Sequence, residues 1–332
     1  MTPEGPASPP GRRGRDPVDV ADLVARARDG EARAVARLIS LVEDAGPALP
    51  EVAAALAPHG GRAQVVGLTG APGVGKSTTT TALVGVLRGR GLRVGVLAVD
   101  PSSPFSGGAL LGDRVRMQDH AGDDGVYIRS MATRGHLGGL AWATPQALRV
   151  LDVAGCDVVL VETVGVGQSE LEVASLADTT LVLLAPGMGD GIQAAKAGIL
   201  EVADVLVVNK ADREGADRTV RDLRSALALG GRHEAPGAWC PPVVRTVATA
   251  GTGVEDLARA LAEHRAWLAS SGEGDRRRAA RAAREIEAVA LTGLRERMGQ
   301  VRGSAALGAL AAQVVAGRTD PFRAAALLLD QL

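Results

Sequence analysis

Apolar positions along the chain follow two spacings, and their alternation predicts a layered α/β domain. From position 18 to 57 the spacing is helical, and one set falls at i, i+3, i+4 and i+7: Val35, Leu38, Ile39 and Val42. From Gln64 onward, short apolar runs are separated by helical or loop segments. These runs are 65–69, 93–99, 157–161, 180–184, 205–208 and 243–247. Such alternation is typical of a mostly parallel central sheet that is flanked by helices on both faces.

The composition limits which residues can form the core and which partners and locations this domain can have. Hydrophobic residues make up 46% of the 332 positions and aromatic residues only 2%, so the core must consist of Val, Leu, Ile and Ala. The net charge of -1 gives no global field that would attract nucleic acid or an anionic membrane. No apolar stretch reaches the roughly 18 residues that a membrane span needs. We therefore expect a cytoplasmic protein without nucleic-acid or membrane partners.

Two cysteines are too few for a disulfide framework. Cys156 and Cys240 also match no metal-site spacing. We expect both to be small buried hydrophobic residues in a reducing compartment.

A glycine-rich motif lies between the first apolar run and a predicted helix. Positions 70–77 read Gly-Ala-Pro-Gly-Val-Gly-Lys-Ser, the pattern of a P-loop, and a helix is expected over 76–88. The glycines let backbone N–H groups turn toward a phosphate, and the helix N-terminus adds its positive end. The lysine serves the β- and γ-phosphates, and the serine hydroxyl ligates Mg²⁺. The candidate phosphate-binding residues are Gly70, Gly73, Val74, Gly75, Lys76, Ser77 and Thr78.

Two strands end in carboxylates that are candidates for a metal or water role. One predicted strand ends at Glu162 and another at Asp100. Because ligands of open parallel sheets bind at the carboxyl ends of the strands, both acids are expected near the phosphate loop. Gly165 lets a backbone N–H approach the γ-phosphate, as in a switch that is ordered by that phosphate.

A second motif, Asn-Lys-Ala-Asp, predicts the choice of base. Asn209, Lys210 and Asp212 follow the apolar run 205–208. The carboxylate of Asp212 can accept hydrogen bonds from both N1–H and the 2-amino group of guanine, whereas adenine would leave it unsatisfied. GTP is therefore the expected substrate. Val247 stands where many GTPases have serine, so a contact to the base near Ala248 has to come from backbone N–H alone.

Read together, these residues resemble the methylmalonyl-CoA mutase-associated GTPases, the MeaB/ArgK family. The resemblance runs from about position 61 to 253 and extends more weakly into both helical ends. It is carried by several long motifs, which are 99–104, 107–108, 111–117, 137–139, 161–170 and 186–190, the last leading into Gln193 and Lys196. Phe105 departs from the commonest pattern, as do Val247 and the long Pro-rich tail.

The resemblance implies roles that the spacing alone does not. Asp100, Asp113 and Glu162 would surround Mg²⁺ and the attacking water, together with Ser77 from the loop. Switch I would lie within 101–136 and switch II within 162–170. An additional switch, 187–196, would let Lys196 swing toward the phosphates when a mutase is bound. These five residues with charged side chains form the expected catalytic set: Lys76, Asp100, Asp113, Glu162 and Lys196.

The implied function is that of a chaperone for an adenosylcobalamin-dependent acyl-CoA mutase, with methylmalonyl-CoA mutase as the first candidate client. GTP hydrolysis would gate loading of the cofactor and protect or reactivate the enzyme. No D-x-H-x-x-G sequence that could supply a histidine to cobalt is present, so adenosylcobalamin is assigned to the partner. The resemblance also implies a homodimer that forms through C-terminal helices.

These expectations divide the chain into four parts. They are a disordered tail at 1–17, a helical element at 18–61, a P-loop GTPase domain at 62–268 and a helical dimerisation arm at 269–332. An arginine cluster at 275–284 is interpreted as a solvated helix face, with a docking surface as the alternative.

Other functional classes stay open at this point. A nickel-inserting GTPase would be expected to carry a Cys/His cluster beside the nucleotide, which Cys156 and Cys240 do not supply. A small-molecule or transport-linked kinase would need an acceptor pocket with a catalytic base, and the Asn-Lys-Ala-Asp motif disfavours ATP. A non-catalytic binding module is disfavoured by the full set of phosphate and metal ligands. The client mutase is not specified by the sequence.

Overall fold

A computed structural model describes the chain in two compact units, Met1–Ser270 and Ser271–Leu332. The described residues are 18–44, 48–100, 120, 122–132, 143–163, 169–187, 200–229, 237–301 and 304–329.

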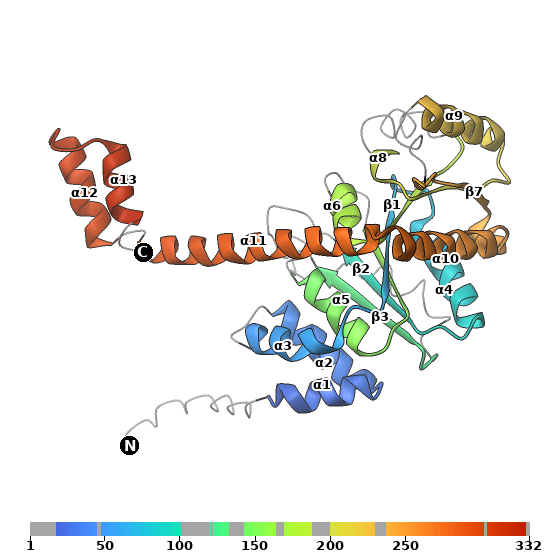
Figure 1. Ribbon diagram of the computed structural model, residues 1–332, viewed down its shortest axis with the longest axis horizontal. Helices are drawn as coiled ribbons and strands as arrows, with labels where there is room; N and C mark the ends of the chain where they lie inside the picture. Colours follow the sequence, from blue (N-terminus) through green and yellow to red (C-terminus); the bar gives the residue numbers. More distant parts are fainter. Residues whose placement is uncertain are drawn as a thin grey trace, which may run out of the picture. The chain divides into compact units, whose positions relative to one another are not determined.

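The centre of the first unit is a seven-stranded sheet in which every pairing of the described strands is parallel (Figure 1). Its order is β3-β2-β4-β1-β5-β6-β7. The strands are β1 Gln64–Thr69, β2 Val94–Asp100, β3 Val126–Ala132, β4 Val158–Thr163, β5 Thr179–Leu184, β6 Val205–Asn209 and β7 Val243–Thr246. The predicted fold class, a P-loop α/β sheet flanked by helices, is confirmed.

One strand, β3, is missing from the six predicted runs. It pairs with β2 along its whole length, from Val126 opposite Val94 to Ala132 opposite Asp100. Its apolar residues are interrupted by Arg129 and Ser130, because β3 is an edge strand and polar positions are tolerated there. A search for continuous apolar runs therefore overlooks it.

Helices cover both faces of the sheet. On one face α4 (Lys76–Gly89) and α10 (Val254–Ser271) enclose a core that includes Leu83, Leu160 and Leu257. On the other face α5 (Thr144–Val153) and α6 (Ser169–Leu176) belong to a second core. The helix α9 (Ala216–Leu229) packs on β5 and β6, and α8 (Leu200–Val202) is a single short turn before β6. Alternate residues of each inner strand thus enter different cores, as expected for a doubly covered parallel sheet.

Three N-terminal helices join the second core and lie beside α5 (Figure 1). They are α1 Val20–Arg28, α2 Ala32–Glu43 and α3 Leu49–Leu56. The helically spaced set Val35, Leu38, Ile39 and Val42 is fully buried, which confirms that prediction. Polar contacts fix the helices to edge strand β3, because Tyr127 donates its hydroxyl to the Gly30 carbonyl at 3.0 Å and Arg129 pairs with Glu43.

The second unit consists of α11 (Glu273–Val301), α12 (Ala305–Val315) and α13 (Pro321–Leu329). Several large apolar side chains of α11 are exposed: Ile286, Val289, Leu291 and Leu294. In the arginine cluster, Arg276 pairs with Glu273 and Arg278 pairs with Asp275 at 3.1 Å, both at i,i+3 spacing. Arg276 and Arg278 are exposed, in line with the predicted solvated face.

The two cysteines differ in environment. Cys156 is buried, and burial raises the pKa of its thiol to about 12. Cys240 is exposed, so the prediction of two buried thiols is wrong for this residue. It precedes Pro241 and Pro242 in the segment before β7, outside the apolar run that enters the core. In the part of the chain that the structure describes, no helix has the length and apolarity that a membrane span requires.

Candidate active site

The phosphate-loop motif connects the middle strand β1 to α4. Three of its glycines have positive φ: Gly70 at +138°, Gly73 at +79° and Gly75 at +97°. Residues with a Cβ rarely adopt these backbone angles, so the glycines allow the loop to turn. At Gly70 a Cβ would also collide with the backbone carbonyl of Leu183 in β5. The sequence thus builds a tight loop at the carboxyl edge of the sheet, where α4 begins at Lys76.

Lys76 lies inside this loop. Its ammonium group donates to the Gly70 carbonyl at 2.7 Å and to the Ala71 carbonyl at 3.3 Å, and the residue is buried. Ser77 and Thr78 follow in the first turn of α4 and are half-buried. The charge of the lysine is therefore held over the loop, next to the helix N-terminus that attracts anions.

Glu162 lies near the end of β4, in register with Leu68 of β1 and Ala98 of β2. Its side chain is 3% exposed, and its Oε2 accepts a hydrogen bond from the hydroxyl of Thr80 at 2.6 Å. A buried carboxylate is thereby held beside α4, the helix that carries Lys76 and Ser77. A carboxylate next to this helix and the hydroxyl of Ser77 in its first turn are both hard oxygen ligands, the kind that Mg²⁺ prefers.

The other predicted carboxylates and switch residues are described only in part. Asp100 is the last residue of β2, and its backbone pairs with Ala132. Its side chain lies outside the described part of the structure, as do Asp113, Gly165 and Lys196.

Asn209, at the end of β6, connects three segments of the site. Its Nδ2 donates to the Val74 carbonyl at 2.9 Å, and its Oδ1 accepts from Thr246 Oγ1 and from the Ala248 N–H, each at 3.1 Å. The residue is 2% exposed. The first residue of the Asn-Lys-Ala-Asp motif is therefore a structural bridge between the phosphate loop and the segment after β7.

Lys210 has φ 56°, and among the described residues other than glycine it alone has a positive φ. Its Nζ donates to the Gly73 carbonyl at 2.6 Å. A left-handed conformation is costly for a residue with a Cβ and persists only where surrounding contacts enforce it. Here the turn redirects the chain after β6, so that Lys210 reaches back to the phosphate loop and the following residues line a pocket.

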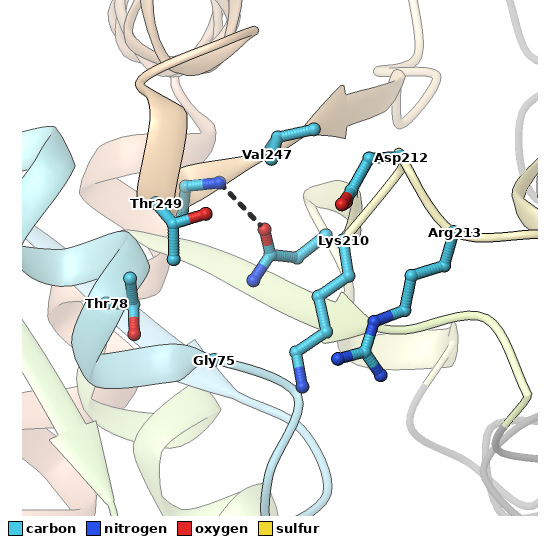
Figure 2. Close-up of a pocket in the computed structure, with 9 residues that line it drawn as sticks. Gly75, Thr78, Lys210, Asp212, Arg213, Val247 and Thr249 are labelled. Carbon is cyan, nitrogen blue, oxygen red and sulfur yellow. Dashed lines mark hydrogen bonds between the residues drawn. The ribbon is translucent and has the colours of Figure 1, made fainter.

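This pocket is the candidate base site (Figure 2). It is lined by Gly75, Thr78, Asn209, Lys210, Asp212, Arg213, Val247, Ala248 and Thr249. In Figure 2, Lys210 and Arg213 lie on one side of the pocket and Thr78 and Thr249 on the other. The structure thus brings the predicted residues Gly75, Thr78 and Asp212 to one place.

Two lining residues were missing from the predicted set, namely Arg213 and Thr249. Each directly follows a predicted residue, and that adjacency was the available signal. The Ala248 N–H already donates to Asn209 Oδ1, so a base contact from this group would have to share the proton. Val247 lines the pocket without a hydroxyl, as its identity requires.

The chain is similar to known GTPases, both in its family model and in its individual relatives. The model of the family described as methylmalonyl Co-A mutase-associated GTPase MeaB matches residues 35–302. A protein named as a GTPase in Pyrococcus abyssi is 46% identical over 316 residues, which covers 94% of this chain and 97% of the relative. The mitochondrial methylmalonic aciduria type A homolog of Mus musculus is 42% identical over 211 residues, covering 63% of this chain and 50% of that protein.

A solved structure is similar over nearly the whole chain. It is titled as a LAO/AO transport system kinase, with a TM-score of 0.68 and 28% sequence identity. The match covers 94% of this chain and 96% of that chain.

Proposed function

The chain belongs to the family of methylmalonyl-CoA mutase-associated GTPases and is a GTP hydrolase, and from this premise we propose that its hydrolysis cycle serves an adenosylcobalamin-dependent acyl-CoA mutase. On this proposal it gates cofactor loading and protects or reactivates the mutase, with methylmalonyl-CoA mutase as the first candidate client. The observation that carries the proposal is the family match over 35–302, which includes the phosphate loop and the base pocket.

The phosphates of GTP would be held by the loop 70–77. Its backbone N–H groups and the N-terminus of α4 supply the dipoles, and Lys76 supplies the mobile charge. In the described geometry Lys76 Nζ donates to two loop carbonyls. Exchanging these neutral acceptors for phosphate oxygens would strengthen its hydrogen bonds, because bonds between two charged groups are shorter and stronger.

Mg²⁺ would be held by Ser77 together with Glu162, Asp100 and Asp113. Of these carboxylates, Glu162 is described with its side chain, and its burial beside α4 fits a hydrated cation at the carboxyl edge of the sheet. When bound, the cation would neutralise charge on the phosphates. The same carboxylates would orient the attacking water and the nucleotide at the carboxyl edge of the sheet.

Guanine would be read by Asp212 from the mouth of the pocket. Asn209 and Lys210 act differently, because their side chains hold the phosphate loop at Val74 and Gly73. We therefore assign base selectivity to Asp212 and pocket integrity to Asn209 and Lys210. A contact from the backbone near Ala248 would complete the base site.

Partner control would act through the switch segments. Gly165 and Lys196 belong to them, and no glutamine directly follows Gly165 to orient water. Intrinsic hydrolysis is therefore expected to be slow, and a mutase that repositions Lys196 would add positive charge at the transition state.

The C-terminal arm would form a homodimer. The exposed apolar side chains of α11 need a partner surface to be removed from water, and a second copy of the chain provides a self-complementary one.

The test is steady-state GTP hydrolysis by the purified protein, with and without an acyl-CoA mutase from the same organism. We expect marked stimulation by the mutase, no measurable hydrolysis for Lys76→Ala, and loss of stimulation with near-normal basal turnover for Lys196→Ala. Turnover without stimulation by any acyl-CoA mutase would refute the chaperone role while leaving the GTPase. Equal loss of basal and stimulated rates in Lys196→Ala would refute its role as a partner-dependent switch.

A further inference from the structure

Four consecutive threonines, at positions 78–81, follow the phosphate loop in α4, and the last three bond back within the helix. Each of these three hydroxyls is near the carbonyl four residues earlier: Thr79 with Gly75 at 2.9 Å, Thr80 with Lys76 at 3.1 Å and Thr81 with Ser77 at 3.0 Å. Such contacts are the usual way in which a threonine is satisfied within a helix. Thr80 differs from its neighbours, because its Oγ1 also lies 2.6 Å from Oε2 of Glu162.

The single proton of the Thr80 hydroxyl has to choose between these two acceptors. A separation of 2.6 Å is typical of an O–H···O⁻ bond to an ionised carboxylate, which is about twice as strong as a neutral bond. The alternative acceptor, the Lys76 carbonyl, is neutral, more distant and already a member of the helix ladder. Thr80 therefore donates to Glu162.

Burial makes this contact selective. Thr80 is 0% exposed and Glu162 is 3% exposed, so water does not compete for the bond. In β4, Val158 and Leu160 enter the same core as α4, and Glu162 continues that alternation toward the helix. Ser77 precedes Thr80 by three residues and so shares its side of α4. One face of one helix thus carries both the loop serine and the residue that holds the carboxylate.

We propose that Thr80 is a positioning residue for the nucleotide-bound Mg²⁺ site, because its hydroxyl fixes the orientation of the Glu162 carboxylate. This inference rests on the proposed role of Glu162 near the cation. It adds a residue outside the phosphate-loop motif, one turn into α4, whose hydroxyl sets how tightly the site holds Mg²⁺. Residues that orient metal ligands in this way typically change metal affinity by about 10- to 100-fold when they are removed.

The experiment measures Mg²⁺ affinity apart from hydrolysis. The protein is loaded with fluorescent mant-GDP, and nucleotide release is followed while Mg²⁺ is varied, which gives the Mg²⁺ concentration for half-maximal retention. Thr80→Val keeps the shape but removes the donor, and we expect it to raise this concentration by about 10- to 100-fold. Thr80→Ser keeps the hydroxyl and should stay close to the wild-type value.

The matched control is Thr79→Val. Thr79 is equally buried on the same helix, but its hydroxyl bonds the Gly75 carbonyl. The Thr79→Val variant should have a lower free energy of unfolding, as Thr80→Val does, but should keep the wild-type Mg²⁺ dependence of nucleotide release. If Thr80→Val does not fold, Thr80→Cys, whose S–H is a weak donor, should give an intermediate shift.

The outcomes separate this inference from the function on which it rests. A wild-type Mg²⁺ dependence in Thr80→Val or in Thr80→Cys, together with a clear shift in Glu162→Gln, would overturn the role of Thr80 and leave the metal role of Glu162 in place. No shift in Glu162→Gln would overturn the assignment of Glu162 itself. Failure of the wild-type protein to retain mant-GDP at any Mg²⁺ concentration would contradict guanine-nucleotide binding.

Discussion

The side-chain amide of Asn209 donates to the carbonyl of Val74 at 2.9 Å, across 135 positions of the chain. This bond ties the end of β6 to the phosphate loop. Lys210 adds a second tie to the same loop at Gly73. Two hydrogen bonds therefore connect the motifs that the sequence presents as separate. A substitution that removes either bond should change the conformation or stability of the phosphate loop.

Asn209→Ala tests this connection. The change leaves the Val74 carbonyl, the Thr246 hydroxyl and the Ala248 N–H without their present partner in a buried place. Each buried polar group that loses its partner costs about 1–3 kcal/mol. We expect a lower free energy of unfolding in urea and weaker mant-GDP binding. A loss of binding without any loss of stability would mean that Asn209 acts on the nucleotide alone.

Asp212→Asn should change selectivity and not stability. Asp212 is exposed at the mouth of the pocket, so its replacement disturbs no buried contact. An amide cannot accept both hydrogen bonds that guanine offers, and each bond to a charged group is worth about 1.5–3 kcal/mol. GTP affinity should therefore fall by about 10- to 100-fold, while xanthosine triphosphate, which presents an oxygen in place of the 2-amino group, should bind better.

Competition against mant-GDP with GTP, ATP and xanthosine triphosphate measures this change. Arg213→Ala is the matched control, because Arg213 lines the same pocket and is equally exposed. We expect it to preserve the preference for guanine over xanthine. Unchanged relative affinities in Asp212→Asn would refute the assignment of base selectivity to this carboxylate.

Two glycines of the phosphate loop allow strain and collision to be separated. Gly73 and Gly75 both have positive φ, so alanine at either position costs about 1–2 kcal/mol of backbone strain. A Cβ at Gly73 meets no atom within 4 Å, whereas a Cβ at Gly75 would collide with the amide of Asn209. We expect Gly75→Ala to lose more stability and more mant-GDP affinity than Gly73→Ala. Equal losses in both would show that the Asn209 amide moves aside freely.

Much of this architecture could be predicted from the sequence. The buried strands read as continuous apolar runs because both faces of the sheet are covered, and the phosphate loop is local, with all its parts within positions 70–77. The edge strand β3 was missed because it carries Arg129 for a contact with Glu43, a residue 86 positions away. A search for local apolar patterns finds only segments whose contacts are close in the sequence. A strand that carries a polar residue for a distant partner therefore looks like a loop in such a search.

Two residues of the site have contacts that depend on partners distant in the sequence. Thr80 looks like an ordinary helix threonine, and its importance depends on Glu162 being brought beside it from 82 positions away. Asn209 is predicted at the base site from its motif, and its hydrogen bonds to Val74, Thr246 and Ala248 add a structural role that depends on the strand order β1-β5-β6-β7. Contacts of this kind follow from topology, which no motif encodes.

Stability at low pH should depend on Asp123. Arg88 of α4 donates to this carboxylate, with Gly125 N–H as a further donor, and together they lower its pKa to about 2. The unfolded value is about 3.9. Because the folded pKa is the lower one, the contribution is fully present above about pH 4 and is lost as the pH falls toward 2.

Asp123→Asn should therefore lower the melting temperature at pH 7 and flatten its fall between pH 5 and 2. Thermal melts monitored by circular dichroism across this range measure the effect. Asp124→Asn is the control, since Asp124 is the exposed neighbour. A parallel decline of wild type and Asp123→Asn would show that other carboxylates determine acid stability.

The proposed homodimer depends on the apolar side of α11, where Ile286 is 69% exposed. Ile286→Glu would place a charge in the dimer interface, and burying an unpaired carboxylate is strongly unfavourable. We expect sedimentation equilibrium to change from dimer to monomer, with basal GTP hydrolysis retained. Ala288→Glu adds the same charge two residues later, on the opposite side of the helix, and should remain dimeric. A monomeric wild-type protein, or an Ile286→Glu variant that still dimerises, would refute the proposal that α11 forms the dimer interface.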